Sequence, residues 1–287
     1  MRHASLARLF AACAFGWLGA GWPASARTLN EVLDRGAFTI CAAPDALPSS
    51  SRDAPEPGFL IELAQTIARQ LGVRLDSDWI EFTRTSRSVN CDAIMAVADD
   101  RPTGDANPAQ AGSRAVSADD GDASRPKIRR QALTRPYARQ VTRIVARDAG
   151  PPIATLDDLR KIEVAAPPDS YAHYKLDTAG VHVRTLFQTE PEILDAVASG
   201  QIAAGAVPDW YFGWYRQTHP GAKLHAENGL VIDPELDYNV CILLRNTDEA
   251  LVRRVDAILT DLIADGTMAR LFRKYGIAYQ PPAAASR

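Results

Sequence analysis

The stretch 38-FTICAAPDALPSSSRDAPEPGFLIELAQTIARQLG-72 decides the fold class. Its first residues, 38–42, form a short apolar run that indicates a buried strand, and a polar, proline-rich loop follows. Residues 58–71 are predicted to form a helix, because their apolar positions recur at the 3.6-residue period of a packed face and Gly72 ends the pattern. Apolar runs at 73–82 and 93–97 predict two further strands. This order of elements indicates a parallel sheet covered by helices.

A second series of strands and helices follows this first one. A strand predicted at 137–147 leads into it. The strands and helices of the second series are then expected to alternate over 162–166, 170–178, 181–187, 190–199, 202–207, 209–217 and 223–232.

The last part of the chain has too few elements for a third domain. It contains a predicted strand at 238–245 and two predicted helices, at 247–264 behind an Asn246-x-x-Glu249 cap and at 267–275. We therefore expect these elements to return to the first lobe, so that the chain crosses between the lobes twice. The predicted fold class is α/β, with two lobes that are each a mostly parallel sheet flanked by helices, joined by a two-strand hinge.

The predicted domain limits follow from these crossings. Lobe 1 would comprise residues 27–147 and 237–287, and lobe 2 residues 148–236. Residues 99–128 interrupt lobe 1 with a segment rich in Asp, Ala, Gly, Ser and Pro that contains no aromatic residue. Such a segment has little apolar surface to bury, which predicts a mobile surface loop.

The first 26 residues have the features of a secretory signal peptide. Arg2 and Arg8 precede an uncharged, mostly apolar run of 14 residues from Leu9 to Trp22, and a small-x-small site follows. A helix of that length extends about 21 Å, short of the roughly 30 Å of a bilayer core, which argues against an anchor. We therefore predict cleavage, location in the periplasm and no membrane span after cleavage.

Charge and cysteine content narrow the classes of function. The chain of 287 residues has a formal net charge of -3 and no basic block, which argues against nucleic-acid binding. Outside the leader the cysteines are Cys41, Cys91 and Cys241, so one disulfide can form and one thiol remains, with the pairing left open. Because none of them is spaced with histidines as metal ligands are, and no cofactor motif occurs, neither a metal nor a cofactor is expected.

Outside residues 99–128, the chain resembles a type II periplasmic solute-binding protein of family 3. The segments that carry this resemblance are TICAAPDALP, GFLIELAQTIARQLG, CDAIMAV, RRQALTRPYARQ, TLDDLRKIEVAAPPDSY and LVRRVDAILTDLIADGTMARLFRKYGI. Three pieces are closer to the accessory binding proteins of PQQ-dependent methanol dehydrogenases. These pieces are Cys41-Ala-Ala-Pro with Leu47-Pro48, Cys91-Asp92, and Arg130-Gln-Ala-Leu-Thr-Arg-Pro-Tyr137. That branch usually has an aromatic residue where this chain has Ser49.

Candidate ligand contacts in lobe 1 lie after strands, because ligands of such folds meet the loops at the carboxyl ends of strands. Asp45 and Ser49 follow the first strand, and Asp99 follows the third. Arg130 lies close to where the resemblance places the arginine that holds a carboxylate, and a guanidinium offers two parallel donors for that task. A turn role explains Asp45 equally well, and a solvated surface arginine explains Arg130.

In lobe 2 the candidates lie at the starts of helices. Ser170 and Tyr171 begin a helix directly after a strand, where free amides favour an anion, although a capping role is equally consistent. Asp209 stands where the resemblance places the group that holds an ammonium, and it is also a candidate cap. The following helix, 210–215, is rich in aromatic residues, most of which we expect in the core and one or two in the cleft or on a protein-contact surface.

The resemblance implies a non-catalytic protein. The main prediction is an accessory protein of a quinoprotein dehydrogenase, and the alternative is the receptor of an ABC importer, docking on a permease, for amino acids or other small polar solutes. The chain lacks the GxSxG, HExxH, P-loop and GxGxxG motifs of common enzyme classes. An enzymatic rival with this fold is the cyclohexadienyl dehydratase group, for which Asp99, Asp209 and Lys127 are the candidate acid–base residues.

Overall fold

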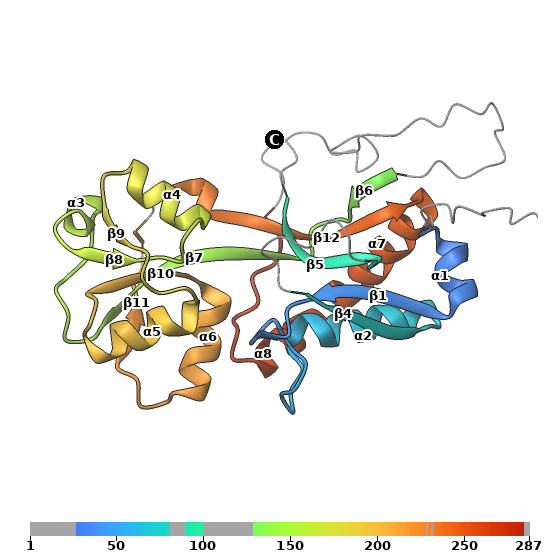
Figure 1. Cartoon of the computed structure of the whole chain (residues 1–287), viewed down its shortest axis with the longest axis horizontal. Coiled ribbons are helices and arrows are strands. Elements are labelled where there is room, and N and C mark those ends of the chain that lie inside the picture. Colours follow the sequence, from blue (N-terminus) through green and yellow to red (C-terminus); the bar gives the residue numbers. More distant parts are fainter. Residues whose placement is uncertain (1–26, 81–89, 100–128, 228, 231, 284–287) are drawn as a thin grey trace, which may run out of the picture.

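The structure is a computed structural model of the whole chain, and it describes residues 27–80, 90–99, 129–227, 229–230 and 232–283. The predicted signal peptide and, apart from Asp99, the predicted insertion lie outside these residues. The described part has two lobes placed along the long axis of the molecule (Figure 1). Two long strands, β7 (Ala138–Arg147) and β12 (Asp237–Thr247), extend from one lobe to the other.

Lobe 1 is built on a sheet in which β1 pairs in parallel with a strand on each side. The strands of this sheet, beside β12, are β1 (Ala37–Ala42), β4 (Arg74–Trp79), β5 (Ala93–Ala98) and β6 (Arg129–Leu133). Strand β12 is antiparallel to both β5 and β6. The helices of this lobe are α1 (Leu29–Arg35), α2 (Phe59–Leu71), α7 (Glu249–Ala264) and α8 (Thr267–Lys274). A small hairpin, β2 (Asp45–Ala46) and β3 (Ser50–Ser51), follows β1.

Lobe 2 repeats this plan around the second half of β7. Its strands are β8 (Glu163–Ala165), β9 (His182–Arg184), β10 (Ala204–Pro208) and β11 (Leu224–Ala226). Strand β8 is parallel to β9 and β10, whereas β10 and β11 are antiparallel to β7. The helical segments are α3 (Leu156–Leu159), α4 (Tyr171–Thr178), α5 (Glu190–Ser199), α6 (Asp209–Thr218) and the 3-10 turn η1 (Pro234–Leu236). The predicted α/β fold with two lobes and a two-strand hinge is confirmed.

The hinge consists of the first halves of β7 and β12, which pair antiparallel from Ala138–Val240 to Val141–Asp237. Residues 142–147 already pair with β10 and β11 of lobe 2, although the predicted limits assigned them to lobe 1. The boundary between the lobes falls within β7, because this strand extends through the hinge from lobe 1 into lobe 2. We propose residue 141 as the first crossing and keep the other predicted limits as a proposal.

Helices from distant parts of the chain pack together in the core of lobe 1. Phe59 of α2 packs against Phe272 of α8, with ring centroids 4.7 Å apart, and both rings contact Trp210 of α6 at 5.0 and 5.6 Å. Trp210 is 2% exposed and belongs to the helix that begins where β10 of lobe 2 ends. One aromatic cluster therefore fixes the start of α6 against lobe 1.

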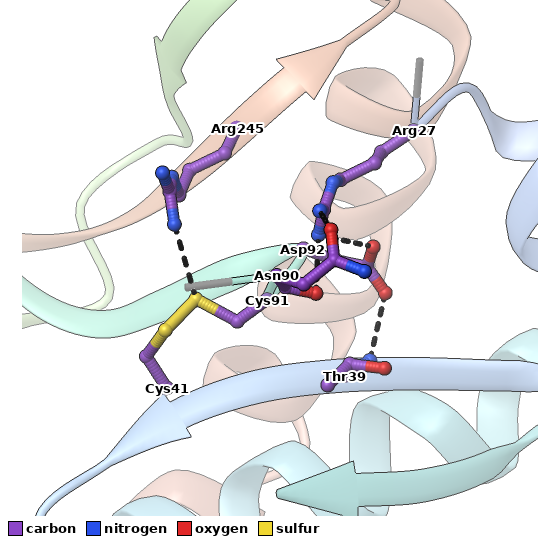
Figure 2. The surroundings of a disulfide bond; sticks show 7 residues. All are labelled: Arg27, Thr39, Cys41, Asn90, Cys91, Asp92 and Arg245. Atoms are coloured by element: carbon purple, nitrogen blue, oxygen red, sulfur yellow. Dashed lines mark hydrogen bonds and ion pairs between the residues drawn. A yellow bond between two sulfur atoms is a disulfide. The ribbon is translucent and has the colours of Figure 1, made fainter. Parts of the chain in front are cut away.

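A disulfide joins Cys41, near the end of β1, to Cys91, just before β5, and Cys241 remains as a buried thiol (Figure 2). The next residue, Asp92, is fully buried and accepts charge-assisted hydrogen bonds from Arg35 at 2.6 Å and Arg27 at 3.3 Å. The backbone N–H of Thr39 also donates to Asp92, at 2.7 Å. These contacts fix the connection between β1 and β5.

Two local predictions need correction. The cap of α7 is Asp248, whose carboxylate accepts from the N–H of Leu251, and not Asn246, which lies within β12 with φ of +46°. The strand continues past the predicted cap because β6, which was not predicted, pairs with its last residues. Strands β9 and β11 are only three residues long, shorter than the predicted 181–187 and 223–232, because β9 pairs with the three-residue β8 and β11 pairs with β7 only from Val145 to Arg147.

Candidate functional site

Two carboxyl groups stand at the starts of neighbouring helices in lobe 2. Glu190 is the first residue of α5, and Asp209 is the first residue of α6. The hydroxyl of Tyr238, on the hinge strand β12, lies close enough to both for their charge to raise its pKa, in addition to the larger effect of burial. Gln140, on the other hinge strand, donates its side-chain N–H to the Tyr238 hydroxyl at 2.6 Å. The carboxyl groups thus lie beside the hinge.

Burial raises the pKa of Asp209 to about 7, far above the usual value of an aspartate. The backbone N–H of Val141 donates to this carboxylate at a long 3.4 Å and, together with the charge of Arg143, lowers the pKa only in part. Asp237 adds a small effect that raises the pKa, and its own carboxylate is paired with Arg139 at 2.8 Å. A cation placed beside Asp209 would therefore be strongly favoured, because it would restore the charged state of this carboxylate.

Glu190 lies close enough to Tyr211 and Tyr238 for its charge to affect both hydroxyls. Burial raises the pKa of Glu190, against a hydrogen bond from its own backbone N–H. Its charge also raises the pKa of Tyr211, after the larger effect of burial, while a hydrogen bond with Ser49 acts in the opposite direction. Ser49, which follows β1 of lobe 1, and Tyr211, on α6, also line the same cavity, so residues of both lobes meet there.

A cavity of about 200 Å³ adjoins this cluster on the lobe 1 side. It lies against the end of β1, the middle of β5 and the first turn of α2, and Tyr211 closes part of its wall. Most of its lining is aliphatic or small, as with Ile40, Leu60 and Ile94, and the hydroxyl-bearing lining residues are Ser49, Ser50 and Tyr211. Among the described residues that line it, none is charged.

The residues predicted for lobe 1 are dispersed. Ser49 joins the cluster through Tyr211. Asp45 is exposed on the β2–β3 hairpin and does not line the cavity. Asp99 follows β5, and its N–H donates to the carbonyl of Asn239 on the hinge at 2.8 Å. The backbone of Arg130 lies in β6, which pairs with residues 243–247 of β12. This end of β12 lies far from lobe 2 (Figure 1). The side chain of Arg130 lies outside the described part of the chain.

In lobe 2, the structure brings Asp209 into the cluster but gives the other two candidates local partners. The Ser170 hydroxyl caps α4 by accepting from the N–H of His173 at 3.1 Å. Tyr171 is 46% exposed and donates its hydroxyl to Glu235, which is also paired with Lys175 at 2.5 Å. Of the dehydratase candidates, Lys127 lies outside the described residues.

The sequence did not single out Glu190, Tyr238 or Gln140. Glu190 was predicted only as the start of a helix. Of the aromatic residues after Asp209, most were expected in the core and one or two in the cleft or on a protein-contact surface; Trp210, Phe212 and Tyr215 are buried, and Tyr211 lines the cavity. A signal was present at Glu190, since a carboxylate at the first position of a helix after a strand resembles the pattern that singled out Asp209. The two hinge residues had no comparable signal.

Comparison with solved structures identifies the class of fold. The L-cystine solute receptor of Neisseria gonorrhoeae, in its unliganded open form, has a TM-score of 0.61 and 14% identity, covering 90% of this chain and 99% of the receptor. An ancestral cationic amino acid solute-binding protein has a TM-score of 0.64 and 19% identity, covering 86% of this chain and 99% of that protein. The fold is that of the type II periplasmic binding proteins.

A third similar structure is an amino acid ABC transporter substrate-binding protein from Streptococcus pneumoniae bound to L-arginine, with a TM-score of 0.61, 18% identity and coverage of 88% of this chain and 98% of that one. The three named structures are solute-binding proteins, and none is an accessory protein of a quinoprotein dehydrogenase. No protein-family model matches the chain. No curated protein matches it in sequence either.

Within the described part of the chain, no group of three or more His, Cys, Asp or Glu side chains is arranged to hold a metal ion. Likewise, no helix in those residues combines the length and apolar character that crossing a bilayer requires.

Proposed function

We propose that this protein is the solute-binding receptor of an ABC importer, that it acts in the periplasm, and that it binds a small solute bearing a protonated amine between its lobes. The observation that carries this proposal is that Ser49 of lobe 1 and Tyr211 of α6 line one cavity, with the charge of Glu190 in reach of Tyr211 and the carboxyl group of Asp209 beside the hinge. The fold shared with amino acid and cystine receptors supports it. The importer role was the alternative in the sequence prediction.

The amine follows from the electrostatics of the cluster. Glu190 and Asp209 are both buried enough to raise their pKa values, and the tyrosines beside them are neutral at pH 7. A carboxylate in such surroundings is stabilised by an ammonium group that donates directly to it. Binding of an amine would therefore release a proton from Asp209 near neutral pH.

Two lobes joined by paired strands provide the movement that a receptor needs. A ligand that touches both lobes binds the closed form more tightly, and it shifts the population toward that form. In this protein the contacts would come from Glu190 and Asp209 on one side and from Ser49 on the other. The closed form would then be the signal recognised by a membrane permease.

The test is a thermal-shift and calorimetric screen of the purified protein against amino acids, amines and amine-free carboxylates at pH 8. A ligand present at 100 times its dissociation constant adds about 2.7 kcal/mol of stability. We expect amine-bearing solutes to stabilise the protein and amine-free ones to have no effect. Asp209→Asn and Glu190→Gln should each weaken amine binding at least tenfold, whereas Asp53→Asn, a change of an exposed carboxylate in lobe 1, should not.

Silence across all amine-bearing solutes would contradict the proposal. If the silent protein instead bound a PQQ-dependent dehydrogenase, the accessory role predicted from the sequence would replace the receptor role. Turnover of a cyclohexadienyl substrate, lost in Asp209→Asn, would show a dehydratase.

A further inference from the structure

The apolar cavity that Tyr211 lines is not needed to bind an ammonium group at Glu190 and Asp209, so it is available to another part of the solute. Its volume of about 200 Å³ is larger than the roughly 150 Å³ of an engineered apolar cavity that binds benzene. Its walls come from three separate segments of lobe 1 and from one residue of lobe 2, Tyr211. A space of this size and lining is suited to an apolar group about as large as a phenyl ring.

The cavity and the carboxyl cluster share a boundary residue. Tyr211 lines the cavity, and its hydroxyl lies within the electrostatic reach of Glu190. Tyr238 in turn lies within reach of both Glu190 and Asp209. Tyr211 and Tyr238 therefore connect the cavity to the two carboxyl groups.

The walls of the cavity are held in place. Cys41 forms part of the lining and is joined by its disulfide to Cys91, which is itself fully buried. Ile61, from the first turn of α2, is 4% exposed and packs in the main core of lobe 1. A preformed apolar pocket of this kind gains affinity from an apolar group without having to be ordered first.

We infer that the solute is an amine carrying an apolar group of about phenyl size, aromatic or branched alkyl, with the apolar group in the cavity bounded by Ile40, Leu60 and Ile94 and the ammonium at Glu190 and Asp209. This inference rests on the proposed receptor function and specifies its ligand. It separates this protein from the similar structure bound to L-arginine, whose ligand has a long polar side chain.

The experiment is calorimetric titration of the purified protein at pH 8 with ethylamine, butylamine, benzylamine and phenethylamine, and with L-alanine, L-phenylalanine and L-arginine. Each buried methylene should improve affinity about fourfold along the alkylamines. Burial of a phenyl ring contributes about as much as burial of a Phe side chain, so phenethylamine should bind roughly 100-fold more tightly than ethylamine. Ala96→Leu, which fills the cavity from β5, should remove most of that difference while leaving ethylamine unchanged.

Ala46→Leu fills the same cavity from the β2–β3 hairpin and serves where Ala96→Leu does not fold, as judged by thermal unfolding. The matched control is Ala154→Leu, at an exposed position of lobe 2, which should bind every probe as the original protein does. Tight binding of L-arginine with no gain along the apolar series would overturn this inference and leave the receptor function standing. Absence of binding by every amine would overturn both.

Discussion

Two clusters of buried charge in this molecule are built in opposite ways. Asp92, at the start of β5 in lobe 1, is fully buried and receives donors from Arg27, Arg35 and the backbone of Thr39. Asp209, beside the hinge, accepts from the backbone N–H of Val141, at 3.4 Å, and from that of Trp210, and these bonds and the nearby charge of Arg143 do not offset its desolvation. The Asp92 carboxylate is paired with two arginines of its own chain, whereas the charge of Arg143 lowers the pKa of Asp209 only in part.

A carboxylate that supports the fold and a carboxylate that is available to a ligand differ in where their partners come from. A buried carboxylate that only supports the fold needs its partners in the same chain, because an uncompensated buried charge is very costly. A carboxylate kept for a ligand is stable without full compensation only if it can take up a proton, which the raised pKa of Asp209 allows. The predictions below test this distinction in the order of expected effect.

Asp92→Ala should have the largest effect on folding. The substitution leaves the Arg27 side chain, which is 6% exposed, buried with its charge uncompensated, and the expected loss is about 3–5 kcal/mol in the free energy of unfolding. Urea unfolding measures it, with Asp53→Ala as the control, since the Asp53 side chain is 78% exposed. A loss below about 1 kcal/mol, on the scale of ordinary surface substitutions, would mean that the Asp92 cluster does not support the fold.

Removal of the disulfide should come next. The bond spans 50 residues, and Cys41→Ala with Cys91→Ala is expected to cost about 2–4 kcal/mol, because the unfolded chain regains the freedom of a closed loop. The free energy of unfolding with and without reductant measures this. A reductant should destabilise the original protein and not the double variant. Equal sensitivity of both proteins would contradict the assignment of the bond to Cys41 and Cys91.

At pH 4, where Asp209 is protonated in the folded protein, Asp209→Asn should have the smallest effect on folding, and it should increasingly stabilise the protein relative to the original chain as the pH rises. The pKa of Asp209 is about 7 in the folded protein and below 4 in the unfolded chain, so the folded state holds more protons between these values. The stability that this group contributes is therefore lost as the pH rises from about 4 to about 7. Asp209→Asn should remove this decline, and parallel curves of stability against pH for the two proteins would contradict the raised pKa.

Much of the fold was predictable from local patterns. The apolar period of residues 58–71 and the terminating Gly72 correspond to α2, and the apolar stripe of residues 251–262 lies on the buried face of α7. The strand β6, Arg129–Leu133, was not predicted because its residues do not alternate regularly between apolar and polar. They form a strand because they pair with an edge of β12. Pairing between segments more than 100 residues apart leaves no local signal.

The candidate site was less predictable than the fold. Asp209 and Ser49 could be selected because each follows a strand, and the same rule also selected Asp45 and Tyr171, which lie on exposed surfaces. Glu190 and Tyr238 were not predicted, because what distinguishes them is burial and the effect of the Glu190 charge on the pKa of Tyr238. Neither can be read from their positions in the sequence. Their role in binding stays a prediction.

The sequence alone determined the alternation of strands and helices, the two α/β series and the apolar faces that pack them, because each of these depends on neighbours within about a dozen residues. Only the tertiary structure decided that Cys41 pairs with Cys91, that Asp92 is paired with Arg27 and Arg35, and that burial raises the pKa values of Glu190 and Asp209. The physical reason is that pairing, burial and electrostatic coupling depend on distances in space, which the folded chain sets between residues far apart in sequence.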